Sequence, residues 1–310
     1  MQKQFIIHFK LLIVAAIWGA GWAAGRIMAL DMPPITGAWI RYLIAITCFL
    51  FWLKMIGLLK MPTKGQWKLA FMIGFFSTAM YQIFFMFGMK YTAAGDASLM
   101  ITFNPLFTAL LAIPLLSEKM TLRLASGLAL GVSGVTILFL YSPNVNLPAD
   151  ERILGDILIA IAALSWAFSS ILMKKAMSQP TADASEPLSP LTLTVWASVA
   201  GFVFLTPWAG WETVQGGIPS ISARAWWATI FLAILSTVVS YVWFADGIKV
   251  IGAGKAALYV YLVPPFGILS GWYLLDEQLG WSLLFAFILI VGGVALAQSE
   301  KRLQQVASEE

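Results

Sequence analysis

The chain alternates long apolar runs with short polar segments over its whole length. A helix that crosses the hydrocarbon core of a bilayer needs about 20 mostly apolar residues, and ten runs meet this requirement. The predicted spans are residues 9–29, 35–56, 67–89, 94–116, 122–141, 154–174, 190–208, 225–246, 253–275 and 281–298. The pattern predicts an all-α integral membrane protein with ten transmembrane helices.

The composition points the same way. Of the 310 residues, 60% are hydrophobic and 11% are charged, whereas soluble domains carry roughly 25% charged residues. No cleavable signal peptide is expected, because the first apolar run lacks a small-residue cleavage pattern and nine more runs follow it. The single cysteine, Cys48, cannot form an intrachain disulfide.

The basic residues indicate the orientation in the membrane. If the N-terminus is cytoplasmic, fourteen Lys and Arg residues fall in inner segments and four in outer segments, namely Arg26, Lys90, Arg152 and Arg224. Cytoplasmic loops of membrane proteins carry such an excess. Both termini are therefore expected in the cytoplasm, and the net charge of +4 needs no nucleic-acid partner.

A long stretch of the sequence occurs twice. Residues 90–118 (KYTAAGDASLMITFNPLFTALLAIPLLSE) recur as residues 249–277 (KVIGAGKAALYVYLVPPFGILSGWYLLDE), a shift of 277 − 118 = 159 positions. The predicted repeats are residues 1–143 and 144–310. Each contains five spans, an odd number, so the second repeat is expected to be inverted relative to the first.

Proline interrupts the fourth and the ninth span at equivalent positions, Pro105 and Pro264. In hydrocarbon, a broken helix is tolerated where protein or a water-filled cavity satisfies the freed backbone groups. A pair of interrupted helices in two inverted repeats is the best sequence indication of a transporter's binding site. We therefore expect a central cavity and alternating access, with the two prolines at the helix breaks.

Polar and aromatic residues inside the spans are candidates for the cavity wall. Several share one helix face by their spacing of three and four residues, and many recur at equivalent positions of the two repeats. The candidates are Ser77, Thr78, Tyr81, Gln82, Met100, Asn104, Ser240, Tyr241, Phe244, Tyr259 and Tyr261. The alternative for the Ser and Thr residues is a hydrogen bond between packed helices.

Trp18 and Trp166 are equivalent at a shift of 148, and the polar loop 179–187 accounts for the difference of eleven residues between the two shifts. Tryptophan near a membrane surface is commonly an interfacial anchor. Trp18 and Trp166 lie deeper inside their spans, so the other interpretation is that they line the substrate pathway. An aromatic cavity suits flat or cationic substrates.

Three charged residues have two interpretations each. Arg41, inside the second span, is either a counter-charge for a substrate carboxylate or a structural residue that binds backbone carbonyls or reaches the outer interface. Glu118 and Glu277 either cap a helix or tie down the following loop, or they form gating ion pairs.

The sequence lacks the residues that several classes of function require. All Asp and Glu residues fall in loops, in tails or within a turn or two of span ends, so no titratable group for proton coupling is evident at depth. The sequence has no P-loop, no Cys/His cluster and no nucleophile–base pair. We expect no metal, no cofactor and no enzymatic activity. Facilitated export fits best, although a tyrosine, a span-end carboxylate or a water chain could still move protons.

The motifs resemble a known family. IWGAGW (17–22), NPLFTALLAIPLLSEKMT after the first break and VPPFGILSGWYLLDEQL after the second resemble the EamA-type branch of the drug/metabolite transporter superfamily. Within it, the chain is most similar to YddG-type exporters of aromatic and other amino acids in bacterial inner membranes. The resemblance implies a basket of helices around a central cavity, and its motif residues are Pro105, Glu118, Pro264 and Glu277.

The sequence therefore predicts a bacterial inner-membrane exporter of amino acids and similar small amphipathic metabolites. Efflux of cationic or aromatic drugs, with or without proton coupling, is the alternative, and a non-transporting scaffold or sensor is a third. The expected partners are a small-molecule substrate and the lipid bilayer, and the expected unit is a monomer.

Overall fold

The computed structural model describes residues 2–116, 118–144, 146–178, 180–186, 188–217 and 220–309. Within these ranges all regular elements are helices, and ten segments are long and apolar enough to cross a membrane. They are Phe5–Asp31, Pro34–Met55, Lys64–Tyr91, Ala94–Leu116, Leu122–Tyr141, Ala149–Met177, Pro190–Gly216, Ala223–Ile251, Lys255–Leu275 and Trp281–Ser299. The all-α fold and the ten predicted spans are confirmed.

Six spans are formed by single helices, and four are interrupted. The single helices are α1 (Gln2–Asp31), α2 (Pro34–Met55), α7 (Leu122–Tyr141), α8 (Ala149–Ser178), α9 (Pro190–Gly216) and α14 (Trp281–Glu309). The third and eighth spans contain π-helices, as α3 (Lys64–Gly74), η1 (Phe75–Met80) and α4 (Tyr81–Tyr91), and as α10 (Ala223–Ile230), η3 (Phe231–Val239) and α11 (Ser240–Ile251). The fourth and ninth are broken, as α5 (Ala94–Met100), η2 (Ile101–Phe103) and α6 (Asn104–Leu116), and as α12 (Ala253–Val260) and α13 (Val263–Leu275).

The breaks occur where proline removes a backbone donor. A proline inside a helix cannot bond the carbonyl four residues earlier and collides with it. Pro105 follows a short 3₁₀ turn that begins at Ile101, and Pro264 follows the end of α12 at Val260. Ile101 and Val260 lie four residues before Pro105 and Pro264. Their carbonyl groups are therefore the ones that the two prolines cannot bond.

Side-chain hydrogen bonds accompany the π-helix of the eighth span. The hydroxyl of Thr237 donates to the carbonyl of Leu232 at 2.8 Å, and that of Ser240 donates to Leu235 at 2.8 Å. Both bonds reach back five residues, which is the spacing of a π-helix. Since η1 and η3 lie at repeat-related positions, the widened turns belong to the architecture of both repeats.

The packing of the helices follows a pseudo-twofold exchange of the two repeats. The second spans of the repeats pack together (α2 with α9), and so do the fifth spans (α7 with α14). The first span of each repeat packs against the third and fourth spans of the other, as α1 against α11 and α13, and α8 against α4 and α6. This exchange is the pattern expected of inverted repeats.

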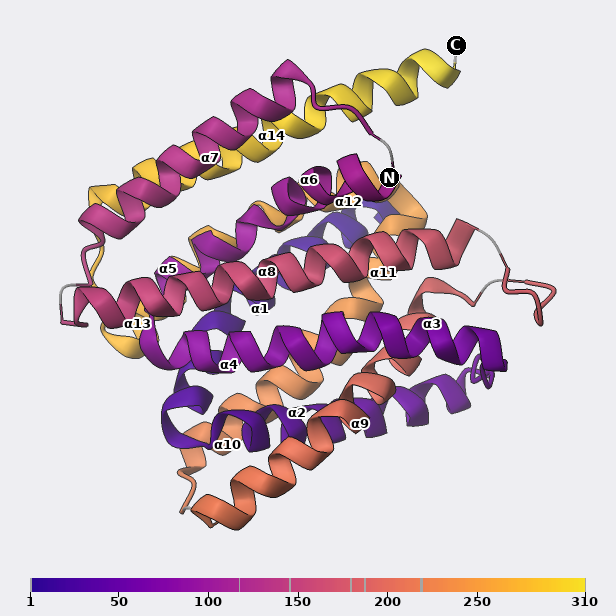
Figure 1. Ribbon diagram of the computed structural model, residues 1–310, viewed down its shortest axis with the longest axis horizontal. Helices are drawn as coiled ribbons and strands as arrows, with labels where there is room; N and C mark the ends of the chain where they lie inside the picture. The colour runs from indigo at the N-terminus through magenta and orange to yellow at the C-terminus, as the bar shows by residue number, and fades with distance from the viewer. Residues whose placement is uncertain are drawn as a thin grey trace.

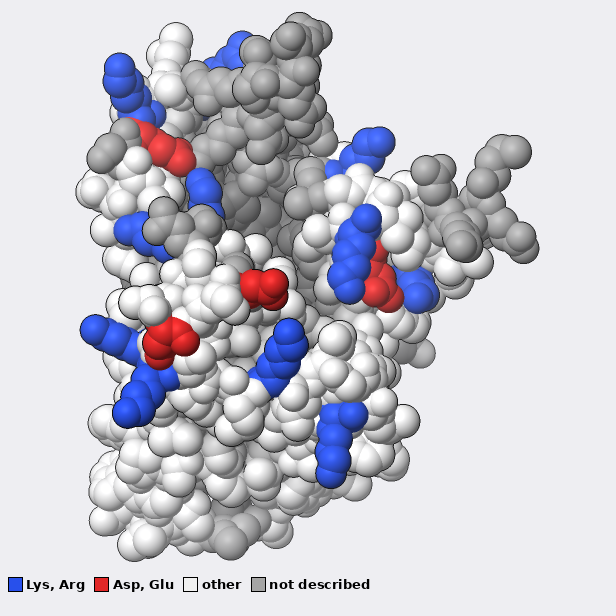
Figure 2. Space-filling view, turned by 90° about the vertical axis from the view of Figure 1, so that its right-hand side faces the viewer, with Lys and Arg blue, Asp and Glu red and all other residues white. Residues whose placement is uncertain are grey.

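The two ends of the bundle differ. The N-terminal end of α1 and the C-terminal end of α14 lie on the same side, whereas α8 begins on the opposite side (Figure 1). We call the end with the termini the proximal end and the other the distal end. The proximal end carries lysine and arginine side chains with fewer acidic ones between them (Figure 2).

The polar loop between α8 and α9 docks onto the proximal start of α3. The side chain of Thr63 accepts from the backbone N–H of Gln66, which caps this helix. Asp183 accepts from the N–H of Gly65 at 2.8 Å and from the Thr63 hydroxyl at 2.9 Å. The bond from Gly65 contributes most to lowering the pKa of Asp183, to about 2, so this carboxylate is ionised at neutral pH. Residues 179 and 187, the ends of the predicted insertion, lie outside the described residues.

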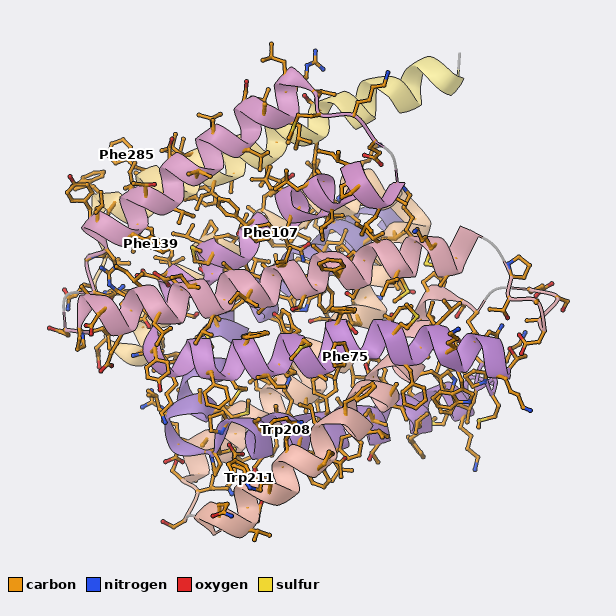
Figure 3. All side chains as sticks on the ribbon, viewed as in Figure 1. Phe75, Phe107, Phe139, Trp208, Trp211 and Phe285 are labelled. Carbon is orange, nitrogen blue, oxygen red and sulfur yellow. The ribbon has the colours of Figure 1, made fainter. Side chains whose placement is uncertain are left out.

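Large apolar side chains cover the outside of the bundle. Trp208 and Trp211 on α9 are 56% and 62% exposed, and Phe285 on α14 is 56% exposed (Figure 3). In water this surface would be unfavourable, but hydrocarbon tails cover it at no such cost. The outer surface therefore agrees with a membrane location.

Close approach of α7 and α14 depends on glycine. A Cβ atom built on Gly293 would lie 2.4 Å from the carbonyl oxygen of Gly127, whereas one built on Gly292 meets nothing within 4 Å. Small residues at such crossings let two helix backbones pack directly.

We predict opposite effects for two neighbouring substitutions. Gly293→Ala should lower the free energy of unfolding by about 1–3 kcal/mol, since the methyl group forces α7 and α14 apart. Gly292→Ala, its matched control, should raise that free energy by about 0.5–1 kcal/mol, because alanine is the better helix former. Unfolding of the purified protein in detergent measures both. Equal effects of the two substitutions would contradict the close packing at Gly293.

Candidate functional site

A cavity of about 410 Å³ lies where the interrupted spans meet. This volume is within the usual range of small-molecule sites. Its wall is mostly aromatic and apolar with a few polar side chains. The lining residues are Trp18, Gly21, Trp22, Arg41, Tyr42, Tyr81, Gln82, Phe85, Ile101, Thr102, Asn104, Pro105, Trp166, Leu232, Ser236, Tyr241, Phe244, Ala257, Val260, Tyr261, Val263 and Gln298.

Both repeats supply equivalent positions to this wall. Phe85 and Phe244 line it (244 − 85 = 159), as do Gln82 and Tyr241 (241 − 82 = 159). The helix breaks contribute Asn104 from one repeat and Val263 from the other. The cavity therefore lies at the interface of the two repeats, where the chemistry of equivalent positions differs.

The aromatic rings on the two sides of the cavity hold one another in place. The ring centroid of Trp18 lies 5.2 Å from that of Phe244 and 6.1 Å from that of Tyr241. On the other side, Tyr81 packs edge-on against Trp166 at 5.4 Å. The indole N–H of Trp18 donates to the carbonyl of Ser236 at 3.0 Å. Such contacts favour fixed ring orientations, so the wall is preorganised.

Arg41 is the one charged side chain among the lining residues. It is 8% exposed. Its Nη1 donates to Gln82 at 3.4 Å and its Nη2 to the Thr237 hydroxyl at 3.2 Å, while its buried Nε has no hydrogen-bond partner. Among the described residues no carboxylate pairs with it. The cavity therefore contains an uncompensated positive charge with a free donor.

The cavity contains ten of the eighteen residues that the sequence singled out. These are Trp18, Arg41, Tyr81, Gln82, Asn104, Pro105, Trp166, Tyr241, Phe244 and Tyr261. Their predicted part in binding a substrate stays a prediction. The other eight, which are not among the lining residues, are Ser77, Thr78, Met100, Glu118, Ser240, Tyr259, Pro264 and Glu277.

The residues outside the cavity have other contacts. Thr78 packs so closely on Gly201 that a Cβ atom there would lie 2.3 Å from it, and Met100 is buried in the core. Ser77 is half-buried in η1. The hydroxyl of Tyr259 hydrogen bonds with the ring of His8 at 2.7 Å. For the hydroxyl residues of the π-helices, interhelical packing and local bonding describe the observed contacts.

Twelve of the 22 lining residues were not singled out from the sequence (22 − 10 = 12), Tyr42 and Gln298 among them. Tyr42 adjoins Arg41, and its ring lies 5.7 Å from the guanidinium carbon. Gln298 accepts from the hydroxyl of Tyr261 at 2.7 Å. Gln298 is the last residue of the last predicted span. Its position at a span end gave no indication of a contact with the ninth span. Its place near the proximal end of that run also shows that the cavity reaches toward the proximal end.

The two repeat-related glutamates have equivalent basic neighbours. Glu277 lies 3.9 Å from Arg26 at the distal end, and Glu118 lies 4.0 Å from Lys174 at the proximal end. Arg26 and Lys174 are equivalent at the shift of the first spans, 174 − 26 = 148. Each pair therefore joins the first span of one repeat to the segment after the fourth span of the other.

Glu277 also caps a helix of the other repeat. Its carboxylate accepts from the backbone N–H groups of Ala94 at 2.6 Å and Gly95 at 3.0 Å, at the start of α5. Burial raises the pKa of the Glu277 carboxyl, and the two N–H groups and Arg26 act in the opposite direction. Capping and ion pairing, which the sequence left as alternatives, occur together at this residue.

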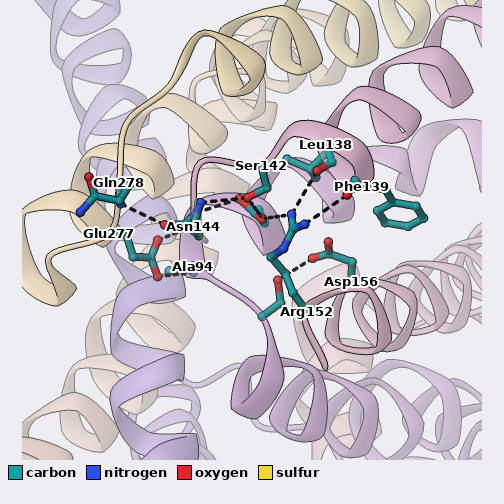
Figure 4. A network of polar contacts seen from close by, with 12 residues as sticks. Ala94, Leu138, Phe139, Ser142, Asn144, Arg152, Asp156, Glu277 and Gln278 are labelled. Carbon is teal, nitrogen blue, oxygen red and sulfur yellow. Dashed lines mark hydrogen bonds and ion pairs between the residues drawn. The ribbon is translucent and has the colours of Figure 1, made fainter. Parts of the chain in front are cut away.

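Around Glu277 lies a buried network that we call the distal polar cluster. It consists of Arg26, Thr92, Asp96, Ser142, Asn144, Arg152, Asp156 and Glu277. Figure 4 shows the part of it around Ser142, Asn144, Arg152, Asp156 and Glu277. Arg26 donates to the carbonyls of Met89 and Thr92, and the side chain of Asn144 accepts from the N–H of Gln278 at 2.9 Å. The cluster thus connects α1, α5, α8 and the segments that follow α4, α7 and α13.

Two aspartates of the cluster are completely buried, Asp96 and Asp156. Asp96 accepts from Ser142 at 2.6 Å and from Asn144 at 3.2 Å, and lies 3.5 Å from Arg152. The sequence placed both aspartates near span ends, where they lie, but gave no sign of their burial. The prediction of facilitated transport rested on the lack of buried titratable groups, and this premise does not hold.

Comparison with known proteins gives the family. The sequence model of the EamA-like transporter family matches residues 5–140 and 153–298. The chain belongs to this family. As an EamA-type protein it is a multi-pass membrane transporter, and the resemblance of its motifs to the EamA-type branch is confirmed.

Full-length relatives support this assignment. An uncharacterized transporter of Archaeoglobus fulgidus is 25% identical over 297 residues, which cover 95% of this chain and 98% of the relative. A probable amino-acid metabolite efflux pump of Escherichia coli is 27% identical over 286 residues, 91% of each chain. A solved crystal structure aligns over 94% of this chain and 98% of its own with a TM-score of 0.60 and 19% identity, which supports the fold.

The distal cap provides a stability test. Glu277→Gln removes the charge that accepts from Ala94 and Gly95, and bonds to a charged group contribute roughly 1.5–3 kcal/mol. We expect a loss of that size in the free energy of unfolding, measured in detergent. Asp276→Asn, an exposed neighbour with a φ of 55° that asparagine tolerates, should change it little. Equal losses would contradict the capping role.

Proposed function

We propose that this transporter exports amino acids, aromatic ones among them, and related small carboxylates through the central cavity by alternating access. The observation that carries the proposal is the uncompensated Arg41 in an aromatic cavity. The two repeats, residues 1–143 and 144–310, supply twelve and ten of the 22 lining residues. The name of the E. coli relative, a probable amino-acid metabolite efflux pump, agrees with this substrate class.

Arg41 has the properties of a carboxylate receptor. A guanidinium binds a carboxylate through two parallel hydrogen bonds, and Nε of Arg41 has no other partner. The present bonds of Nη1 and Nη2 are 3.4 Å and 3.2 Å long, to neutral oxygens of Gln82 and Thr237. A carboxylate would therefore replace long bonds to neutral oxygens by bonds between opposite charges.

The remaining wall suits the other parts of an amino acid. A substrate ammonium group is attracted to aromatic faces by about 0.5–2 kcal/mol, and Trp18, Tyr81 and Trp166 supply such faces. The side-chain oxygens of Gln82 and Asn104 are neutral acceptors for the same group. Flat side chains can stack on these rings, so aromatic amino acids fit without excluding smaller ones.

The position of the cavity between the two ends supports export when combined with the charge pattern. The cavity reaches toward the proximal end through Gln298, while the distal polar cluster ties the opposite end together. The excess of Lys and Arg favours a cytoplasmic proximal end. In this orientation the cavity takes substrate from the cytoplasm of a bacterial cell, and opening of the distal end releases it outward.

Cationic drugs are the competing substrate class. The aromatic wall would bind them, but Arg41 would repel a cation without a carboxylate. Efflux of such drugs would be favoured if Arg41 lay at the lipid interface, and its burial among the lining residues speaks against that arrangement.

We predict that Arg41→Gln removes the preference for a carboxylate. In proteoliposomes, wild-type protein should transport labelled tryptophan and discriminate against tryptamine, which lacks the carboxylate. A lost charge-assisted interaction of roughly 1.5–3 kcal/mol corresponds to about 10–150-fold weaker apparent affinity for tryptophan. Tryptamine transport should not fall in this variant.

The control is Arg123→Gln, which removes an exposed arginine at the start of α7. It should leave the ratio of tryptophan to tryptamine unchanged. Preference for tryptamine in the wild type would favour the cationic substrates. Lack of uptake of tryptophan, phenylalanine, threonine and methionine by folded wild-type protein would contradict the proposal.

Alanine substitutions test the cavity wall itself. Tyr81→Ala, Gln82→Ala, Trp166→Ala and Tyr241→Ala should each reduce uptake of labelled tryptophan at least about fivefold, because each removes a surface worth roughly 1–3 kcal/mol. Protein yield and the elution profile in detergent report on insertion and folding. Tyr273→Ala, at a side chain that is 77% exposed, is the control. Normal uptake by all four variants would disprove this location of the site.

A further inference from the structure

We infer that the distal polar cluster is a proton-binding site in which Asp156 holds one proton while the distal end is closed, and loses it when that end opens. This site lies outside the substrate cavity. Its effect on transport rests on the proposed function, but proton binding itself does not.

The surroundings of Asp156 favour a neutral carboxyl group. The side chain is completely buried; one oxygen bonds with the Thr92 hydroxyl at 2.5 Å, and the other has no hydrogen-bond partner. No ion pair involves Asp156 among the described residues, although Arg152 lies one turn away on the same helix. A buried carboxylate without such partners is very costly, and burial of the protonated acid costs much less.

Asp96 shows the contrast. Its oxygens accept from Ser142 and Asn144 and face Arg152 at 3.5 Å. Such a set of donors stabilises an ionised carboxylate. The two buried aspartates therefore have different protonation states. Asp96 forms the ion pair with Arg152, which Asp156 would need in order to be ionised.

A count of charges leads to the same result. Two arginines, Arg26 and Arg152, face three carboxyl groups, Asp96, Asp156 and Glu277. If all five were ionised, the buried cluster would have one excess negative charge, and one bound proton makes it neutral. Nearby groups do not supply the missing charge, since Lys90 on α4 is exposed, and Asp150 and Glu151 at the start of α8 are exposed and acidic.

The internal repeat shows that the fold does not require acids at these positions. At the shift of 159, Asp96 corresponds to Lys255 (255 − 96), and at the shift of 148, Asp156 corresponds to His8 (156 − 8). Both equivalents are exposed and basic or neutral. The Arg26–Glu277 pair, by contrast, has its counterpart in Lys174–Glu118. The acidic pair is therefore specific to the distal end.

Proton binding is linked to the movement that transport needs. The cluster joins α1, α5 and α8 with the segments after α4, α7 and α13, so the distal end cannot open while it stays intact. Opening admits water, which solvates the Asp156 carboxylate and releases the proton. A proton held in one state and lost in the other shifts their equilibrium by up to about tenfold per pH unit, with low pH favouring the closed distal end.

Infrared spectroscopy on protein labelled with ¹³C-aspartate tests the site without transport. At neutral pH in detergent, wild-type protein and Asp150→Asn, the exposed control on α8, should show the C=O stretch of one buried protonated aspartic acid. Asp156→Asn should lack this band and fold normally, since the amide replaces a neutral group. Absence of the band from the wild type, its persistence in Asp156→Asn, or failure of that variant to fold would overturn the assignment.

Two further measurements delimit the inference. Addition of sodium at constant pH should leave the band unchanged, and its loss would show that the cluster takes a metal cation instead. In proteoliposomes, tryptophan transport should depend on the pH at the distal side in the wild type and lose this dependence in Asp156→Asn. If no amino acid is transported, the proposed function fails while the infrared result still decides on the proton site.

Discussion

The hydrogen-bonding requirement of the backbone in hydrocarbon governs this structure. Every span must satisfy its N–H and C=O groups, and within the part of the chain that the structure describes four of the ten spans depart from the regular α-helix. These four are repeat-related, and they lie where helices of both repeats meet around the cavity. Irregular backbone and substrate-sized space thus occur together, since the interior of the bundle is where an interrupted helix finds partners.

The internal repeat separates architecture from function. Features found in both halves, such as the proline breaks, the π-helices and the ion pairs Arg26–Glu277 and Lys174–Glu118, belong to the fold. Features found in one half only are not required by the fold, so they can determine substrate specificity and the difference between the two ends. Asn104 against Val263 in the cavity, and Asp96 against Lys255 at the bundle ends, are of this second kind.

The sequence predicted the ten spans, both helix breaks and the aromatic wall, because apolar length, proline and helical spacing each determine these locally. It did not distinguish Tyr241, which lines the cavity, from its neighbour Ser240, which bonds within its own helix. Nor did it reveal that Asp96 and Asp156 are buried. Periodicity identifies a helix face, but the neighbour against which this face packs depends on the tertiary structure. A charged residue near a span end can equally well be exposed to water or buried, so the sequence does not decide between the two.

The two ion pairs of equivalent glutamates differ in their surroundings. In the distal pair both side chains are 10% exposed, whereas in the proximal pair Lys174 is 68% and Glu118 is 33% exposed. An inverted repeat that rocks about its centre exchanges the environments of its two ends. Enclosure of one glutamate pair is thus matched by exposure of the other when the ends exchange environments, so these two ion pairs together favour neither end state. The buried acids Asp96 and Asp156 have no such counterpart at the proximal end, and they remain as the electrostatic difference between the two ends.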